Sequence, residues 1–64
     1  MGDLEGIILN YLKMNQGSMK FNDKTNPEDI KKHFKASKNA FKRALGGLMK
    51  KGLIEQDENG TRLK

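Results

Sequence analysis

Apolar residues recur at helical spacing in the first stretch of the chain, between Asp3 and about Asn15. Asp3 near the start and Lys13 near the end carry the charges that suit the two ends of a helix dipole. The apolar positions follow the i, i+3, i+4, i+7, i+8 pattern of a helix that buries one side; they are Leu4, Ile7, Ile8, Tyr11 and Leu12. We therefore predict a first helix that turns this stripe toward the core and is ended by Gly17.

The residues around Pro27 predict the start of a second helix. Thr25 or Asn26 is expected to cap it, and Pro27 takes the first helical position, where its missing N–H does no harm. The helix should run to about Lys35. The side chains expected to face the core are those of Ile30 and Phe34.

A third helix is predicted to begin after Ser37, whose hydroxyl can accept a hydrogen bond from a free amide of the first turn. It should end near Gly52, which can adopt the left-handed conformation common after helices. Only Lys35-Ala36 separates the second helix from the Ser37 cap, so the two helices should form a tight helix-turn-helix pair. The apolar stripe of the third helix consists of Phe41, Ala44, Leu45 and Leu48.

Short apolar runs outside the helices predict three strands. Ser18–Phe21 alternates polar and apolar residues, as a strand with one buried side does. Leu53–Gln56 and Thr61–Lys64 flank the turn Asp57–Gly60, in which Asn59-Gly60 is a favoured pair for a hairpin. The order helix, strand, helix, helix, strand, strand is that of a winged helix-turn-helix. We expect an α+β fold in which residues 1–64 form a single domain of three helices and a small antiparallel sheet, whose hairpin is the wing.

The net charge of +5 is unevenly distributed. Most of the Lys and Arg residues lie between Ile30 and Ile54, and none of the eight acids does. A basic block within an acidic frame indicates a polyanionic partner, although a charged run can also be a solvated face. The residues expected to contact such a partner are Lys38, Asn39, Lys42, Arg43, Gly46 and Lys50 on the third helix, Lys31, Lys32 and Lys35 on the second, and Arg62 on the hairpin.

The pair Gly46-Gly47 interrupts the third helix with two residues that each destabilise a helix interior by ~1 kcal/mol relative to Ala. Gly47 lies beside Ala40 and Ala44 on the helix surface, so we expect it to let another helix approach closely. Gly46 lies on the basic face, where packing and the approach of a ligand are both open explanations.

The chain has no constellation of catalytic or metal-binding residues. It contains no cysteine, and its single histidine, His33, is expected to be at the surface or half-buried. The acids are scattered over caps and turns, no Ser or Thr has an adjacent base, and no glycine-rich loop has phosphate-binding spacing. We therefore expect no enzymatic activity, cofactor or metal. No stretch approaches the ~20 apolar residues of a membrane span, and the start lacks a signal-peptide pattern, so a cytoplasmic domain without membrane contact is expected.

The central part of the chain resembles the C-terminal winged-helix domain of the conserved virulence factor B family (CvfB, YitL-like). The matching residues are Asp23-Lys24, Pro27-Glu28, Ile30, Phe34, Ser37-Lys38, Phe41-Lys42-Arg43-Ala44, Gly46, Leu48 and Lys50. Two positions depart from the family pattern: Thr25, where Ser is usual, and Met49, where Tyr is common. The resemblance implies an RNA-binding module in post-transcriptional gene regulation. It also implies that the chain is a C-terminal fragment of a larger bacterial protein, whose S1 domains would be its partners.

Two other functions remain open from the residues themselves. A duplex DNA reader would insert the third helix into the major groove, but the chain lacks the extra helix that sets half-site spacing in dimeric repressors. A protein-interaction domain could use the same fold, but no apolar patch is evident outside the predicted core stripes. We expect the isolated domain to be monomeric and to bind RNA, with DNA as the alternative ligand.

Overall fold

Residues 3–64 are described by a computed structural model, which contains three helices and three strands. The elements are α1 (Leu4–Met14), β1 (Ser18–Met19), α2 (Pro27–Phe34), α3 (Lys38–Lys50), β2 (Ile54–Asp57) and β3 (Gly60–Leu63). The strands form one antiparallel sheet in the order β1-β3-β2. The predicted α+β class, element order and winged helix-turn-helix fold are confirmed.

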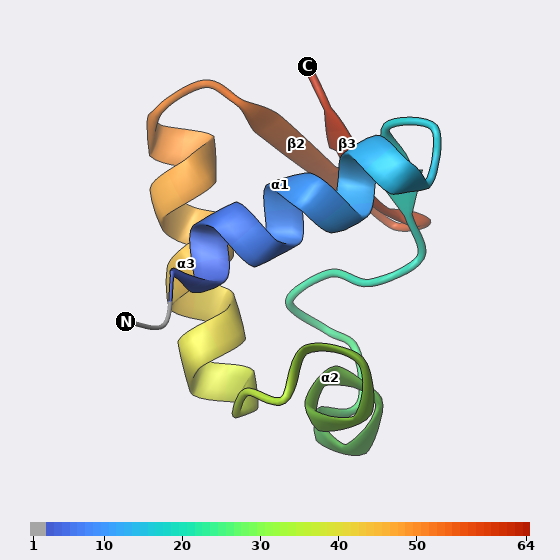
Figure 1. Ribbon diagram of the computed structural model, residues 1–64, viewed down its shortest axis with the longest axis vertical. Coiled ribbons are helices and arrows are strands. Elements are labelled where there is room, and N and C mark those ends of the chain that lie inside the picture. Colours follow the sequence, from blue (N-terminus) through green and yellow to red (C-terminus); the bar gives the residue numbers. More distant parts are fainter. Residues whose placement is uncertain (1–2) are drawn as a thin grey trace.

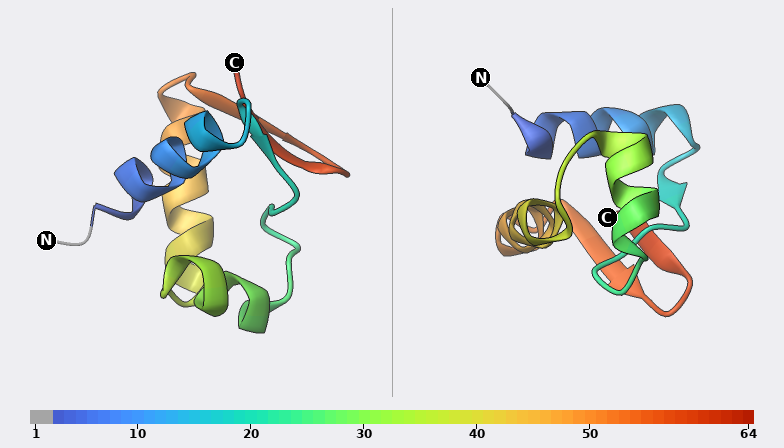
Figure 2. Two further views of the ribbon diagram at one scale, coloured as in Figure 1. Left: turned by 45° about the vertical axis from the view of Figure 1, so that its right-hand side comes forward. Right: turned by 90° about the horizontal axis from the view of Figure 1, so that it is seen from below.

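The three helices pack around one core, and the β2–β3 hairpin forms the wing. Figures 1 and 2 show α1 lying across α3 and the sheet, with α2 near the N-terminal end of α3. The hairpin starts at the C-terminal end of α3 and extends away from it. Among residues 3–64 no helix is long and apolar enough to cross a membrane.

The starts of α2 and α3 are formed by side chains that satisfy the first backbone amides. Asn26 Oδ1 accepts a hydrogen bond from the backbone N of Glu28 at 2.9 Å, so Asn26 is the cap of α2. Thr25 Oγ1 instead accepts from the backbone N of Asn22 at 2.8 Å and holds the loop before the helix. Ser37 caps α3, as predicted.

The core consists of buried side chains from every helix and from the sheet. Its members are Ile8, Leu12, Met19, Ile30, Phe34, Phe41, Ala44, Leu45, Leu48 and Ile54. The stripe predicted for α3 is therefore confirmed in full. Tyr11 is half-buried at the edge, with its ring centroid 5.2 Å from that of Phe34.

The stripe predicted for α1 is wrong at Ile7, whose side chain is 49% exposed. Leu9, absent from the predicted stripe, is half-buried and packs against the core instead. The reason is the contact between α1 and α3, where Glu5 lies directly against Gly47. This contact turns the side of α1 that carries Glu5 and Leu9 toward α3, and it leaves Ile7 in solvent.

The strand predicted over Ser18–Phe21 is shorter, because β1 contains only Ser18 and Met19. Beyond Met19 the chain leaves the ladder, and the carbonyl of Phe21 accepts a hydrogen bond from Thr61 Oγ1 at 2.7 Å rather than from a strand amide. A side chain thus replaces the backbone pairing that the alternating pattern predicted.

The turn of the hairpin spans Asp57–Gly60, as predicted, but Asn59-Gly60 is not its central pair. Glu58 and Asn59 connect the strands, and Gly60 is the first residue of β3, paired with Asp57. A turn with Asn59-Gly60 at its centre requires positive φ at both residues, but Asn59 is not among the residues with positive φ. The backbone N–H of Asn59 instead donates to Asp57 Oδ1 at 2.8 Å, so an aspartate side chain forms the turn.

Candidate nucleic-acid interface

The outward side of α3 is exposed and rich in basic groups. The core stripe turns the opposite side of the helix to solvent, where the exposed residues include Asn39, Lys42, Arg43, Gly46 and Lys50. Lys38, at the first position of the helix, is half-buried. The rotation predicted for this helix is correct because four apolar residues on one side leave it a single way to pack.

The lysines of α2 continue this basic region. Lys31, Lys32 and Lys35 are all exposed, and Lys35 ends the helix in the left-handed conformation with φ +54°. Three residues separate α2 from α3, and the two helices are in contact. We call this set the basic surface; it comprises Lys31, Lys32, Lys35, Lys38, Asn39, Lys42, Arg43, Gly46 and Lys50.

The charges of the basic surface are free of acidic partners. Within residues 3–64 the salt bridges involve only Lys51 and Arg62 among the basic side chains. Lys51 Nζ lies 2.7 Å from Glu5 Oε1, and its hydrogen bond with that carboxylate raises the pKa of Lys51. The cations of the basic surface can therefore bind an anion without first breaking an ion pair.

The two glycines of α3 have different surroundings. A Cβ on Gly47 would lie 2.5 Å from Glu5 Oε2, so Gly47 leaves room for the carboxylate of a residue of α1. A Cβ on Gly46 would meet no atom within 4 Å. Packing within residues 3–64 therefore does not explain Gly46.

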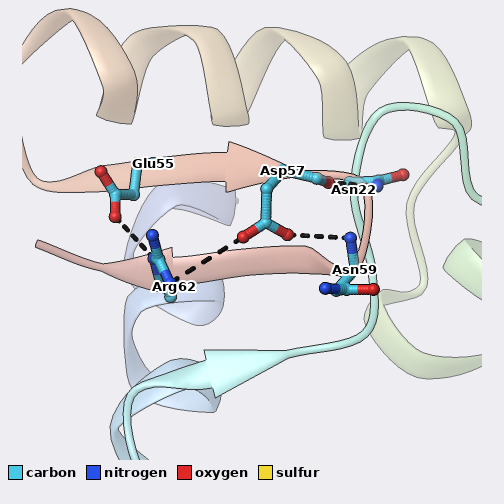
Figure 3. Close-up of polar contacts among 5 residues, drawn as sticks. All are labelled: Asn22, Glu55, Asp57, Asn59 and Arg62. Atoms are coloured by element: carbon cyan, nitrogen blue, oxygen red, sulfur yellow. Dashed lines mark hydrogen bonds and ion pairs between the residues drawn. The ribbon is translucent and has the colours of Figure 1, made fainter.

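Arg62 is separated from the basic surface by its neighbours. Its guanidinium lies on β3, where Nε donates to Glu55 Oε1 at 2.5 Å and Nη1 lies 3.9 Å from Asp57 Oδ2 (Figure 3). The hydrogen bond to Glu55, with the charges of Glu55 and Asp57, raises the pKa of Arg62. Two carboxylates thus compensate this cation, and the structure does not bring Arg62 together with the other predicted residues.

A hollow of about 380 Å³ lies between α3 and the tip of the hairpin. It is lined by Asn22, Asp23, Lys24, Met49, Gln56, Asp57 and Glu58. The buried Asn22 joins its two walls, because Nδ2 donates to the carbonyl of Asp57 at 3.0 Å (Figure 3). The sequence offered no sign of this hollow, because the hydrogen bond connects residues that are 35 positions apart.

The known proteins that are similar to this domain include larger bacterial proteins. The model of the CvfB-like winged helix domain matches residues 7–63. YitL of Bacillus subtilis is 55% identical over 54 residues, which cover 84% of this chain and 18% of that protein. Conserved virulence factor B of Staphylococcus aureus strain USA300 is 44% identical over 48 residues, which cover 75% of this chain and 16% of that protein.

A solved structure has the same fold over the whole chain. It is the crystal structure of a multidomain protein with nucleic acid binding domains from Streptococcus pneumoniae TIGR4, with a TM-score of 0.95 and 52% sequence identity. The match covers 100% of this chain and 22% of that one. The chain thus spans less than a quarter of each of these relatives. With a family model that matches nearly its full length, this chain belongs to the family of CvfB-like winged helix domains.

Proposed function

We propose that this domain binds RNA, without catalysis, through the basic surface on α2 and α3. The observation that carries the proposal is the set of cations on α2 and α3, which are exposed except for the half-buried Lys38. None of them forms an ion pair within residues 3–64, whereas Lys51 and Arg62 do. The Streptococcus pneumoniae relative, described as having nucleic acid binding domains, supports a nucleic-acid ligand. RNA rather than DNA is the choice that the family resemblance supports.

Binding by this surface depends mainly on phosphate contacts. Lys and Arg side chains that neutralise phosphates release bound counterions, which makes the affinity fall steeply with salt. Single-strand binders gain ~1–3 kcal/mol per base from stacking on aromatic rings, but Phe34 and Phe41 are buried here and Met49 stands where a ring is common in the family. The isolated domain should therefore bind RNA with a dissociation constant of roughly 10–100 µM and little sequence preference.

Weak contacts with RNA can still contribute to binding if this domain is part of a longer protein. We propose that it is the C-terminal domain of a protein with S1 domains and extends the RNA footprint of those domains in post-transcriptional regulation. The small share of each relative that this chain spans supports a place in a longer protein, and the family resemblance supports S1 domains as its neighbours. Contacts that are weak in isolation become intramolecular once another domain holds the RNA, and an effective concentration in the millimolar range can raise the overall affinity tens-fold or more.

Reversing two charges at the centre of the basic surface is expected to abolish most RNA binding. In the Lys42→Glu, Arg43→Glu double variant, both exposed side chains would repel the phosphates they now attract. The measurement is an NMR titration of parent and variant with short single-stranded RNA, duplex RNA and duplex DNA at one salt concentration. For the parent, about four phosphate contacts predict a log–log dependence of affinity on salt with a slope near −3 for the single strand.

A matched control reverses the same amount of charge elsewhere. Lys13→Glu, Lys20→Glu changes two exposed lysines of α1 and of the segment after β1, outside the basic surface. It should weaken binding much less than the Lys42, Arg43 variant does. Equal losses in the two variants would mean that net charge alone attracts RNA. If RNA causes the same NMR chemical-shift perturbations in the Lys42, Arg43 variant as in the parent, the basic surface does not bind RNA. A protein-interaction role would then be favoured.

Replacing Gly46 with Ala is expected to change stability and RNA binding in opposite directions. Ala favours a helix interior over Gly by ~1 kcal/mol, and the added methyl meets no neighbour, so the free energy of unfolding should rise by about that amount. The same methyl would hold the ligand away from the helix and weaken binding. Urea unfolding and RNA titration of the same Gly46→Ala sample provide the two measurements. A more stable variant with undiminished RNA affinity would show that no ligand approaches this position.

A further inference from the structure

One flank of α3 is bordered by acidic groups. The hollow between Met49 of α3 and the hairpin tip is lined by three carboxylates, those of Asp23, Asp57 and Glu58, and by one cation, Lys24. All four charged residues are exposed. A phosphate group entering this flank would therefore face a net negative charge, in contrast to the basic surface on the outward side of the same helix.

Hydrogen bonds hold the acidic walls beside α3. The carbonyl of Asp57 accepts from Asn22 Nδ2, and Asp57 Oδ1 accepts from the backbone N of Asn59, so the hairpin tip is held to the loop before α2 (Figure 3). The backbone N of Asp23 donates to Gln56 Oε1 at 3.0 Å, which brings this acid against the hairpin. These contacts join the backbone of Asp23 and Asp57 across the hairpin and the loop before α2.

The position of these acids matters differently for duplex and single-stranded ligands. The major groove of DNA is about 12 Å wide and an α-helix with its side chains is about 10–12 Å across, so a helix in the groove has a phosphate backbone along each flank. If α3 entered a duplex, one backbone would lie along the flank that carries Met49 and the acidic walls. A single strand has one backbone, which can follow the outward side of α3 and the lysines of α2.

We propose, on the basis of the RNA-binding function proposed above, that Asp23, Asp57 and Glu58 determine specificity by excluding duplexes. The wing of this domain then acts by repulsion: it leaves the basic surface available to a single strand and disfavours the second backbone of a duplex. Arg62 does not reverse this effect, because its close ion pair is with Glu55, which lies outside the hollow, and Asp57 is 3.9 Å away.

The Asp23→Asn, Glu58→Gln double variant tests this proposal while retaining the contacts that shape the wing. The side chains of both residues make no hydrogen bond or salt bridge within residues 3–64, so isosteric amides remove charge and keep the fold. The matched control, Glu28→Gln, Asp29→Asn, removes the same charge from exposed positions on α2, beside the part of the basic surface that both ligands share. Parent and variants are titrated with single-stranded and duplex forms of one short DNA sequence and of the same sequence as RNA, at one salt concentration.

The first variant should bind duplexes more tightly by about five-fold for each removed charge that faces a phosphate directly, because this is the effect of two unit charges about 4 Å apart in water. Its affinity for the single strand should change less than its affinity for duplexes, because one backbone on the outward side of α3 does not run along the acidic flank and screening by salt weakens repulsion with distance. The control variant should change its affinity for the single strand and its affinity for the duplex by the same factor. Equal gains for duplex and single strand in the first variant, or no gain for either, would overturn the proposal. A parent that binds none of the ligands would overturn the proposed function together with this inference, whereas a parent that binds with unchanged duplex selectivity in the variant overturns only the inference.

Discussion

Phe41→Ala is expected to lower the free energy of unfolding by about 3–5 kcal/mol, the usual effect of truncating a buried Phe. Phe41 is fully buried, and its ring centroid lies 5.0 Å from that of Phe34, so it joins α3 to α2 in the core. Stabilities of roughly 0.05–0.15 kcal/mol per residue are usual, so a loss of this size would unfold much of so small a domain. Urea unfolding followed by circular dichroism measures the change.

The matched control for this substitution is Ile7→Ala on α1. Like Phe41, Ile7 is an apolar residue inside a helix, but its side chain is exposed. Surface substitutions usually change stability by less than about 0.5 kcal/mol, and this is the expected result. A large loss in Ile7→Ala, or a cooperative Phe41→Ala domain with nearly unchanged stability, would show that the helices are rotated differently about the core.

Gly60→Ala is expected to destabilise the domain by about 2–6 kcal/mol, through backbone strain and overpacking together. Gly60 has φ +141° at the start of β3, a conformation that side chains rarely adopt. An added Cβ would also lie 2.0 Å from the carbonyl oxygen of Met19 and 2.9 Å from the Cα of Lys20. Both are backbone atoms, so β1 would have to separate from β3 to make room.

Gly52→Ala distinguishes strain from crowding, because Gly52 also has positive φ, +73°, but a Cβ there would meet no atom within 4 Å. Its expected loss is about 1–2 kcal/mol, from the left-handed conformation alone. Urea unfolding of both variants gives the stabilities, and hydrogen exchange at the Met19–Thr61 pair reports whether β1 has separated. Equal losses in the two variants would contradict a crowded junction between β1 and β3.

The sequence by itself determined the helices and their order, because the signals for a helix are local. Asn26 and Ser37 satisfy amides two or three residues away, and the stripe of α3 repeats within the helix itself. The same local pattern placed the cations of the basic surface outward, since a helix that buries one side exposes the other. The close approach at Gly47 could also be expected, because a glycine beside two alanines leaves room for a neighbouring helix.

The tertiary structure decided what depends on contacts between distant segments. The rotation of α1 follows from Glu5 against Gly47, the end of β1 from Thr61 bonded to Phe21, and the acidic flank of α3 from Asn22 bonded to Asp57. The partners in each of these contacts lie more than 30 residues apart, and no periodicity or turn preference in either segment specifies the other. Local patterns therefore determined which groups of α3 point to solvent, while packing of the whole chain determined the rotation of α1 and which exposed groups are neighbours.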